Sequence, residues 1–409
     1  MNRPHGGRRK EKQYMLLYTL TYMAIGTLTP LIGQYLAGIG MGGTQVGMIT
    51  SAGTLTAVFA NPFWGRIYTH RGRRHRLLAC LCFAAAAVSL AVRAGNAFWL
   101  ILPCFILLYF FQAPVMSLSD ALAIDDGVTF GHVRTLGAVG FAFAVFAAAH
   151  IASDAGADKI FVVYSLCYTA AAIVILAISS GSAGGHAAVR AASPAFKENT
   201  VQSQAGRRRL FSALLHNRDY ITLVLCAFFI NGTDVANNTF FSFLYIKAGG
   251  TMAGVGVAFL LMAGSEAPFM AASGWLVRRF GRGSILLAAM AVSLLRFGWY
   301  AFEPPWQMLL AFFALQGFVN GITLVEFVRF AADLVPAGML SGAAIALYYA
   351  LGSSASTIVC QAAGGMILDR CGAGGVYLFF ALFNAAGLLL FVISGLFRRS
   401  GKSAGQGDG

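Results

Sequence analysis

Long apolar stretches follow one another along almost the whole chain and are separated by short polar connections. An α-helix needs about 20 apolar residues to cross the hydrocarbon core of a bilayer. By this measure the sequence predicts twelve membrane-spanning helices, the eighth of them interrupted by Pro268. They cover residues 14–36, 44–68, 76–94, 97–124, 132–152, 159–180, 219–246, 251–277, 284–302, 306–333, 340–367 and 373–397. The predicted fold class is therefore an all-α membrane protein.

The connection between the sixth and seventh predicted helices is the longest, and it is rich in glycine, alanine, serine and basic residues. This composition is typical of a linker between two domains. We therefore expect two six-helix bundles, an N-terminal one over residues 1–180 and a C-terminal one over 219–397. A cytoplasmic linker over 181–218 joins them, and a cytoplasmic tail over 398–409 ends the chain.

Two connections at corresponding places in the halves resemble each other. The second predicted helix runs into GRIYTHRGRR and the eighth into GWLVRRFGRG, and each segment has two glycines seven positions apart. The repeated positions are Gly65, Arg71, Gly72 and Arg73 in the first half and Gly274, Arg279, Gly281 and Arg282 in the second. Such an internal repeat indicates duplicated bundles, an arrangement common in transporters.

The composition agrees with a membrane protein, since 58% of the residues are hydrophobic and 11% are charged. The net charge of +14 comes from basic residues that gather in every second connection, which predicts cytoplasmic termini rather than binding to nucleic acid. Basic residues lead directly into the first apolar run, so we expect that run to remain in the mature protein. The seven cysteines lack metal-ligand spacing, and no cofactor or metal is expected.

Two charged residues interrupt consecutive apolar runs. Asp120 lies in the fourth predicted helix and Arg134 near the start of the fifth. A charge at membrane depth is costly and is normally retained because it meets a partner, an ion or a substrate. Consecutive antiparallel helices can bring the two side chains together, so we predict a substrate-binding pair. The alternative is a charge pair that only holds two helices together.

The repeated loops resemble the cytoplasmic signature of the major facilitator superfamily, which reads Gly, three residues, Asp, Arg, any residue, Gly, and Arg or Lys. The acidic position is occupied by Thr69 in the first half and by Arg278 in the second. The resemblance implies the fold of that superfamily, with two six-helix bundles that alternate access to a central substrate.

The segments SDA at 119–121 and FGHVRTLGAVGF at 130–141 resemble helices four and five of the lactose permease group of proton symporters. They are also similar to the branch that includes phenylpropionate and nucleoside permeases. The resemblance implies that Asp120 and Arg134 bind substrate hydroxyls and that Phe141 stacks on a sugar ring. Arg134 and Phe141 are seven residues apart, about two helical turns, and so share one helix face.

In the second half, the same resemblance implies proton coupling by Asp234, Glu266 and Arg296, which interrupt the seventh, eighth and ninth predicted helices. Buried carboxylates beside an arginine can load and release protons as a cavity opens and closes. Asn237 and Asn238 lie beside Asp234 on one helix and are additional candidates for substrate binding.

The tenth and eleventh predicted helices depart from lactose permease. Gln316 and Val319 stand where that permease has a histidine and a glutamate, and Ser353 stands for its lysine. Proton coupling would therefore depend on Asp234 or Glu266 with Arg296. Farther along the tenth helix, Glu326 and Arg329 are three residues apart, which predicts an intrahelical ion pair.

These features predict a secondary transporter that works by alternating access and takes up a small polar organic solute with protons. A sugar or glycoside is the first candidate, followed by a nucleoside or an aromatic acid. A proton-coupled exporter of drugs or metabolites and an uncoupled uniporter remain alternatives. An enzyme is not expected, because the chain has no phosphate loop and no nucleophile motif. We expect a monomer in the lipid bilayer of a bacterial cytoplasmic (inner) membrane.

Overall fold

The computed structural model describes residues 5–68, 74–126, 128, 130–181, 214–335 and 339–399. Side chains are described throughout these ranges except at 5–9, 130–135, 180–181, 339–341 and 399. Every regular element in the described ranges is helical, and they contain no strand. The all-α fold class is thereby confirmed. The predicted loop residues Arg71, Gly72 and Arg73, and most of the predicted linker, lie outside the described residues.

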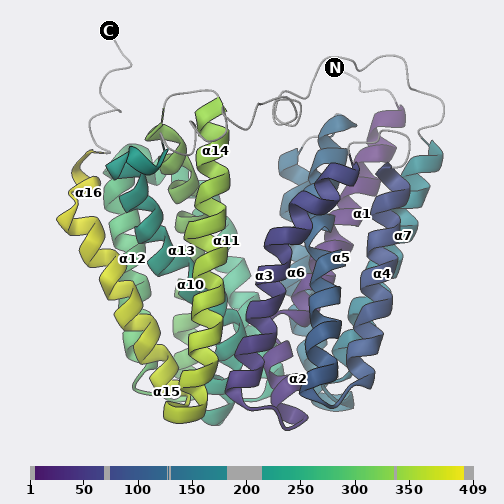
Figure 1. The fold of residues 1–409 in the computed structure, drawn as a ribbon, viewed down its shortest axis with the longest axis horizontal. Coiled ribbons are helices and arrows are strands. Elements are labelled where there is room, and N and C mark those ends of the chain that lie inside the picture. Colours follow the sequence, from purple (N-terminus) through teal and green to yellow (C-terminus); the bar gives the residue numbers. More distant parts are fainter. Residues whose placement is uncertain are drawn as a thin grey trace. The chain divides into compact units, whose positions relative to one another are not determined.

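The chain divides into two compact units, and the first comprises Met1–Ser193 with Thr251–Leu260. In this unit α1 packs along α6 and α7, while α3 and α4 pack on α5 (Figure 1). Small residues permit the α1–α6 contact, since a Cβ at Gly140 would lie 2.9 Å from the carbonyl oxygen of Thr19. Its helices are α1 (His5–Leu28), α2 (Ile32–Gly38), α3 (Gly43–Tyr68), α4 (Arg74–Ala94), α5 (Phe98–Asp125), α6 (Phe130–Ala155) and α7 (Lys159–Gly181).

The second unit comprises Pro194–Gly250 with Leu261–Gly409, so the first residues of α11 belong to the first unit. In the second unit α10 packs along α15 and the π-helix η3, and α12 packs on both α13 and α15 (Figure 1). Its helices are α10 (Arg218–Lys247), α11 (Met252–Phe280), α12 (Arg282–Tyr300), α13 (Trp306–Asp333), α14 (Met339–Leu347), η3 (Tyr348–Ala355), α15 (Ser356–Ile393) and α16 (Leu396–Arg399).

Ten helical stretches of the described chain are long and apolar enough to cross a membrane. The last of them, Gly342–Ile393, covers two predicted helices and changes direction at Gly372, whose φ of 70° is non-helical. The second predicted helix is present as α3, but it is not one of these ten stretches. Its many threonine, glycine and amide residues make it less apolar. Each of the twelve predicted stretches therefore coincides with helix in the structure.

The internal repeat is not limited to the loop sequences, since each half also has an ion pair between corresponding helix ends. α5 and α13 both have 28 residues and both end in an aspartate, Asp125 and Asp333. Arg74 at the start of α4 pairs with Asp125, and Arg282 at the start of α12 pairs with Asp333. The two partners are 51 positions apart in each half. This shared spacing supports an origin of the two halves by duplication.

In the second unit this ion pair is part of a larger group. Arg282 Nε also donates to Glu326 Oε2 at 2.9 Å, and Arg329 donates to Glu326 Oε1 at 3.0 Å. The predicted Glu326–Arg329 pair is confirmed, and the second arginine explains how the fully buried Glu326 is compensated. Gly281 begins this segment with a φ of 80°, a backbone conformation that glycine adopts without strain. Gly65, Gly274 and Arg279 lie in the last turns of α3 and α11.

At the other end of the second unit's helices, between the end of α12 and the start of α13, Glu303 joins three segments of this unit. Its Oε1 accepts from Lys247 Nζ at 2.6 Å and from the backbone N–H of Gly374 at 2.9 Å. Glu303 also has a positive φ of 52°, which is uncommon for a residue other than glycine. It thus ties the end of α10 and the α12–α13 turn to the segment of α15 that follows Gly372.

We expect this contact to make stability depend on pH. The hydrogen bond from Lys247 lowers the pKa of Glu303 below its ordinary value of 4.5. The contribution to stability is therefore complete above pH 4.5 and is lost as the pH falls through the lower folded-state pKa. Melting of the purified protein should show Glu303→Gln to be less stable by up to about 1 kcal/mol at neutral pH. The difference in stability between this variant and the wild type should disappear at acidic pH. A difference that does not change with pH would contradict this account.

Candidate functional site

In the first unit, Asp120 on α5 is held by α1. The hydroxyl group of the buried Tyr18 donates a hydrogen bond to Asp120 Oδ1. One turn earlier, Tyr14 donates to Asp126 Oδ2 at 2.8 Å, so two tyrosines on one face of α1 bind two aspartates near the end of α5. Tyr18 was not among the predicted site residues, although its spacing from Tyr14 is a signal for a shared helix face.

The partners predicted for Asp120 lie on α6. Arg134 is in the first turns of this helix, but its side chain lies outside the described part, so the Asp120–Arg134 pair remains a prediction. Phe141 is half-buried where α6 crosses α1. A Cβ at Gly26 of α1 would lie 2.7 Å from the carbonyl oxygen of Phe141, so the two backbones nearly touch at this point. The position of Phe141 is therefore fixed by the α1–α6 contact.

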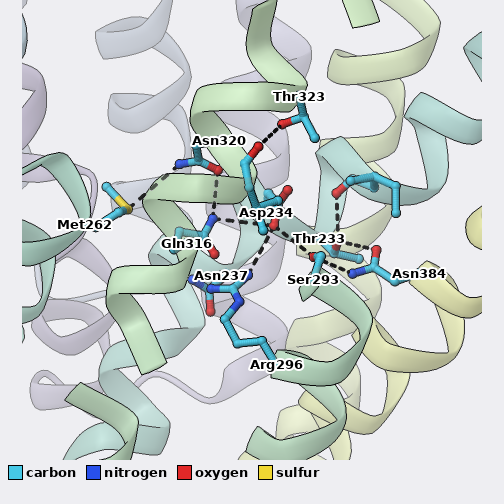
Figure 2. A network of polar contacts seen from close by, with 12 residues as sticks. Thr233, Asp234, Asn237, Met262, Ser293, Arg296, Gln316, Asn320, Thr323 and Asn384 are labelled. Atoms are coloured by element: carbon cyan, nitrogen blue, oxygen red, sulfur yellow. Dashed lines mark hydrogen bonds and ion pairs between the residues drawn. The ribbon is translucent and has the colours of Figure 1, made fainter. Parts of the chain in front are cut away.

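In the second unit, a buried ion pair lies at the centre of a polar network (Figure 2). Arg296 Nη2 on α12 lies 3.3 Å from Asp234 Oδ1 on α10. The same oxygen accepts from Gln316 Nε2 on α13 at 3.4 Å and from Ser293 Oγ at 3.5 Å. The exposed fraction is 1% for Arg296 and 6% for Asp234. Two helices, α12 and α13, thus direct donors at one buried carboxylate oxygen of α10.

Aromatic rings complete the surroundings of the guanidinium group. Its central carbon lies 4.3 Å from the ring centre of Phe297 and 5.8 Å from that of Tyr300. An arginine over aromatic faces gains a favourable cation–π interaction, which is strengthened where water is excluded. Arg296 is therefore fixed on one side by rings and on the other by Asp234.

A chain of amides on α13 connects Asp234 with a second carboxylate. Gln316 Nε2 also donates to Asn320 Oδ1 at 3.0 Å, and Asn320 Nδ2 donates to Glu266 Oε2 of α11 at 3.4 Å. Both predicted proton-coupling acids therefore accept hydrogen bonds from one pair of amides. Figure 2 shows the part of this chain that runs from Asp234 through Gln316 to Asn320. Asn320 was not among the predicted site residues, although two amides four residues apart in an apolar helix indicate a shared polar face.

The network also reaches α15. Asn384 Nδ2 donates to Ser293 Oγ at 2.8 Å, and Thr233 Oγ1 donates to Asn384 Oδ1 at 3.0 Å (Figure 2). The predicted Asn237 is fully buried, and its Oδ1 accepts from Tyr377 of α15 at 2.8 Å. Asn238 is half-buried, and its Oδ1 has no hydrogen-bond partner among the described residues. No group of metal-ligating side chains occurs in the described ranges.

Comparison with known proteins places these features in context. The family model described as the MFS_1 like family matches residues 12–379. The chain is 30% identical to the maltose permease of Geobacillus stearothermophilus over 393 residues, 95% of each chain. It is 26% identical over 379 residues, 90% of each chain, to a protein of Bacillus subtilis (strain 168) described as the uncharacterized transporter YwbF.

Two solved structures resemble the fold at low sequence identity. The nucleoside transporter NupG superposes with a TM-score of 0.75 at 16% identity, over 94% of this chain and 98% of that one. A bacterial homologue of the human lysosomal transporter Spinster, in an inward-facing and unoccupied conformation, gives a TM-score of 0.67 at 12% identity, over 97% of each chain. At these identities the likeness concerns the fold alone.

Proposed function

Because the chain belongs to the MFS_1 like family of the major facilitator superfamily, we propose that this membrane transporter carries a sugar or glycoside such as maltose. The similarity to maltose permease along 95% of both chains supports this substrate class. A nucleoside is the second candidate, because the fold resembles that of the nucleoside transporter NupG. Transport proceeds by alternating access, in a monomer in the bacterial inner membrane with both termini cytoplasmic.

Substrate binding in the first unit belongs to Asp120, Arg134 and Phe141. A guanidinium group offers a planar set of donors for sugar hydroxyls, and a carboxylate accepts hydroxyl hydrogen bonds. The hydrogen bond from Tyr18 supports this role, because it fixes Asp120 in one orientation. In the second unit, Asn237 and Asn238 are additional binding residues next to Asp234.

Proton coupling belongs to Asp234, Glu266 and Arg296. The observation that carries this assignment is the buried Asp234–Arg296 pair, which a chain of two amides joins to Glu266. A carboxylate that is buried beside an arginine can exchange its proton when the conformation changes its surroundings. The ion pairs of Arg282 with Glu326 and Asp333 support a conformational role for the repeated loops.

Uptake into proteoliposomes tests the proposal. An inward proton gradient should drive accumulation of maltose, and Glu266→Gln should abolish accumulation while leaving exchange of maltose for maltose. Asp154→Asn changes an exposed carboxylate of α6 and is the matched control, which should accumulate maltose normally. Gradient-driven uptake of uridine instead of maltose would favour the nucleoside. Uptake of maltose without any effect of the gradient would identify a uniporter.

A further inference from the structure

We propose that Asp234, Asn237, Arg296 and Gln316 form a hydroxyl-binding subsite within the second unit, called here the α10–α12–α13 subsite. It takes two neighbouring hydroxyl groups of a neutral sugar. The inference rests on the proposed sugar transport, and it gives Arg296 and Gln316 a direct part in binding substrate. It also favours a neutral polyol over the aromatic acid that the sequence left open.

The subsite contains a set of buried polar atoms that have no hydrogen-bond partner among the described residues. They are Asp234 Oδ2, Asn237 Nδ2, Arg296 Nε, Arg296 Nη1 and Gln316 Oε1. Asn237 and Gln316 are fully buried, and Arg296 is 1% exposed. Leaving one buried polar group unpaired costs about 1–3 kcal/mol, and more for a charged group. Five such atoms in one place indicate a site built to be filled by a polar ligand.

Three of these four side chains meet at one carboxylate oxygen. Asp234 Oδ1 is within 3.4 Å of both Arg296 Nη2 and Gln316 Nε2. Each unpartnered atom of these three side chains is bonded to the same carbon as one of these contacting atoms. Asn237 follows Asp234 by three residues and lies on the same side of α10.

The chemistry of these atoms decides the class of ligand. The charges of Asp234 and Arg296 balance each other, so a charged ligand would bring an uncompensated charge into a buried site. Arg296 and Asn237 offer donors, whereas Asp234 and Gln316 offer acceptors. A carboxylate ligand only accepts and would leave both acceptors unpaired. A hydroxyl group both donates and accepts, and two neighbouring hydroxyls meet both needs.

The subsite also connects substrate with proton. Asp234 is one of the acids that we assign to proton coupling, and its Oδ2 is one of the atoms offered to the sugar. Two ligands that share a carboxylate change each other's affinity by the same factor. Binding of sugar in this subsite therefore links substrate affinity to the protonation of Asp234 without a separate relay.

A cycle of protein variants and substrate analogues tests the subsite. Calorimetry gives the dissociation constants of maltose and of each monodeoxy maltose for the wild type and for Gln316→Met. This change keeps the side-chain volume but removes the Oε1 acceptor together with the Nε2 donor to Asp234 and Asn320. In the wild type, at least one analogue should bind about tenfold more weakly than maltose, as expected for one lost hydrogen bond. Gln316→Met should bind maltose about tenfold more weakly than the wild type does. The variant should bind that analogue as tightly as it binds maltose.

Gln361→Met is the control, because Gln361 is also buried, on α15, but donates to Thr239 outside the subsite. It should keep the full discrimination. Equal weakening of maltose and all analogues by Gln316→Met would overturn the subsite and assign the polar atoms to bound water. Failure of the wild type to bind maltose would overturn the proposed substrate, and the subsite with it. If Gln316→Met does not fold, Asn237→Ala, which removes Nδ2, goes through the same cycle.

Discussion

Replacement of Arg296 by glutamine should reduce the amount of folded protein and abolish proton-driven uptake. The change leaves Asp234 as a buried carboxylate without a counter-charge, because Arg296 is the cation that contacts it among the described residues. Removing one partner of a buried ion pair costs about 3–5 kcal/mol. Thermal melting in detergent and uptake into proteoliposomes measure the two effects.

The double variant Asp234→Asn with Arg296→Gln separates stability from coupling. It contains no uncompensated charge, so most of the lost stability should return. Proton-driven accumulation should stay absent, because the acid that exchanges protons is gone. Arg329→Gln is the matched single control, since Arg329 is 54% exposed and Arg282 still compensates Glu326; it should cost less than about 1 kcal/mol. A double variant as unstable as Arg296→Gln alone would show that the charge is not the source of the loss.

The helices were predictable because the bilayer sets the length of an apolar run and the backbone must satisfy its hydrogen bonds within each helix. The break at Gly372 lies between the two predicted helices 340–367 and 373–397. Helix ends were less predictable, as the first helix shows. The apolar pattern begins at residue 14, but α1 already begins at His5; the residues directly before the apolar run, RRKEKQ at 8–13, are good helix formers and extend the helix.

The site was predictable only in part. Charges in apolar runs identified Asp234 and Arg296 because such residues are rare, and the structure brings them within 3.3 Å. Their role in coupling stays a prediction. Asn320 and Tyr18 were missed because amides and tyrosines also occur in ordinary helix packing. Only the packing of α13 against α10 and α11 shows that Asn320 connects two carboxylates.

Replacement of Gly317 by alanine should destabilise the protein where α13 crosses α11. A Cβ at Gly317 would lie 2.6 Å from the backbone nitrogen of Glu266 and would also collide with the Met262 carbonyl oxygen and the Ser265 hydroxyl group. Backbone atoms cannot move aside unless the helices separate. Overpacking of this kind costs about 1–3 kcal/mol. Separation would also carry Glu266 away from Asn320, so proton-driven accumulation should fall further than exchange of substrate.

Gly298→Ala is the matched control on α12, because nothing lies within 4 Å of a Cβ at Gly298. Alanine is the better helix former by about 1 kcal/mol, so this variant should melt at the same temperature as the wild type or higher. The comparison separates close packing from helix propensity, since both changes add one methyl group to a helical glycine. A Gly317→Ala protein as stable as Gly298→Ala would show that α11 and α13 do not approach each other this closely. In that case the amide chain from Asp234 to Glu266, which crosses the same contact, would lose its structural basis.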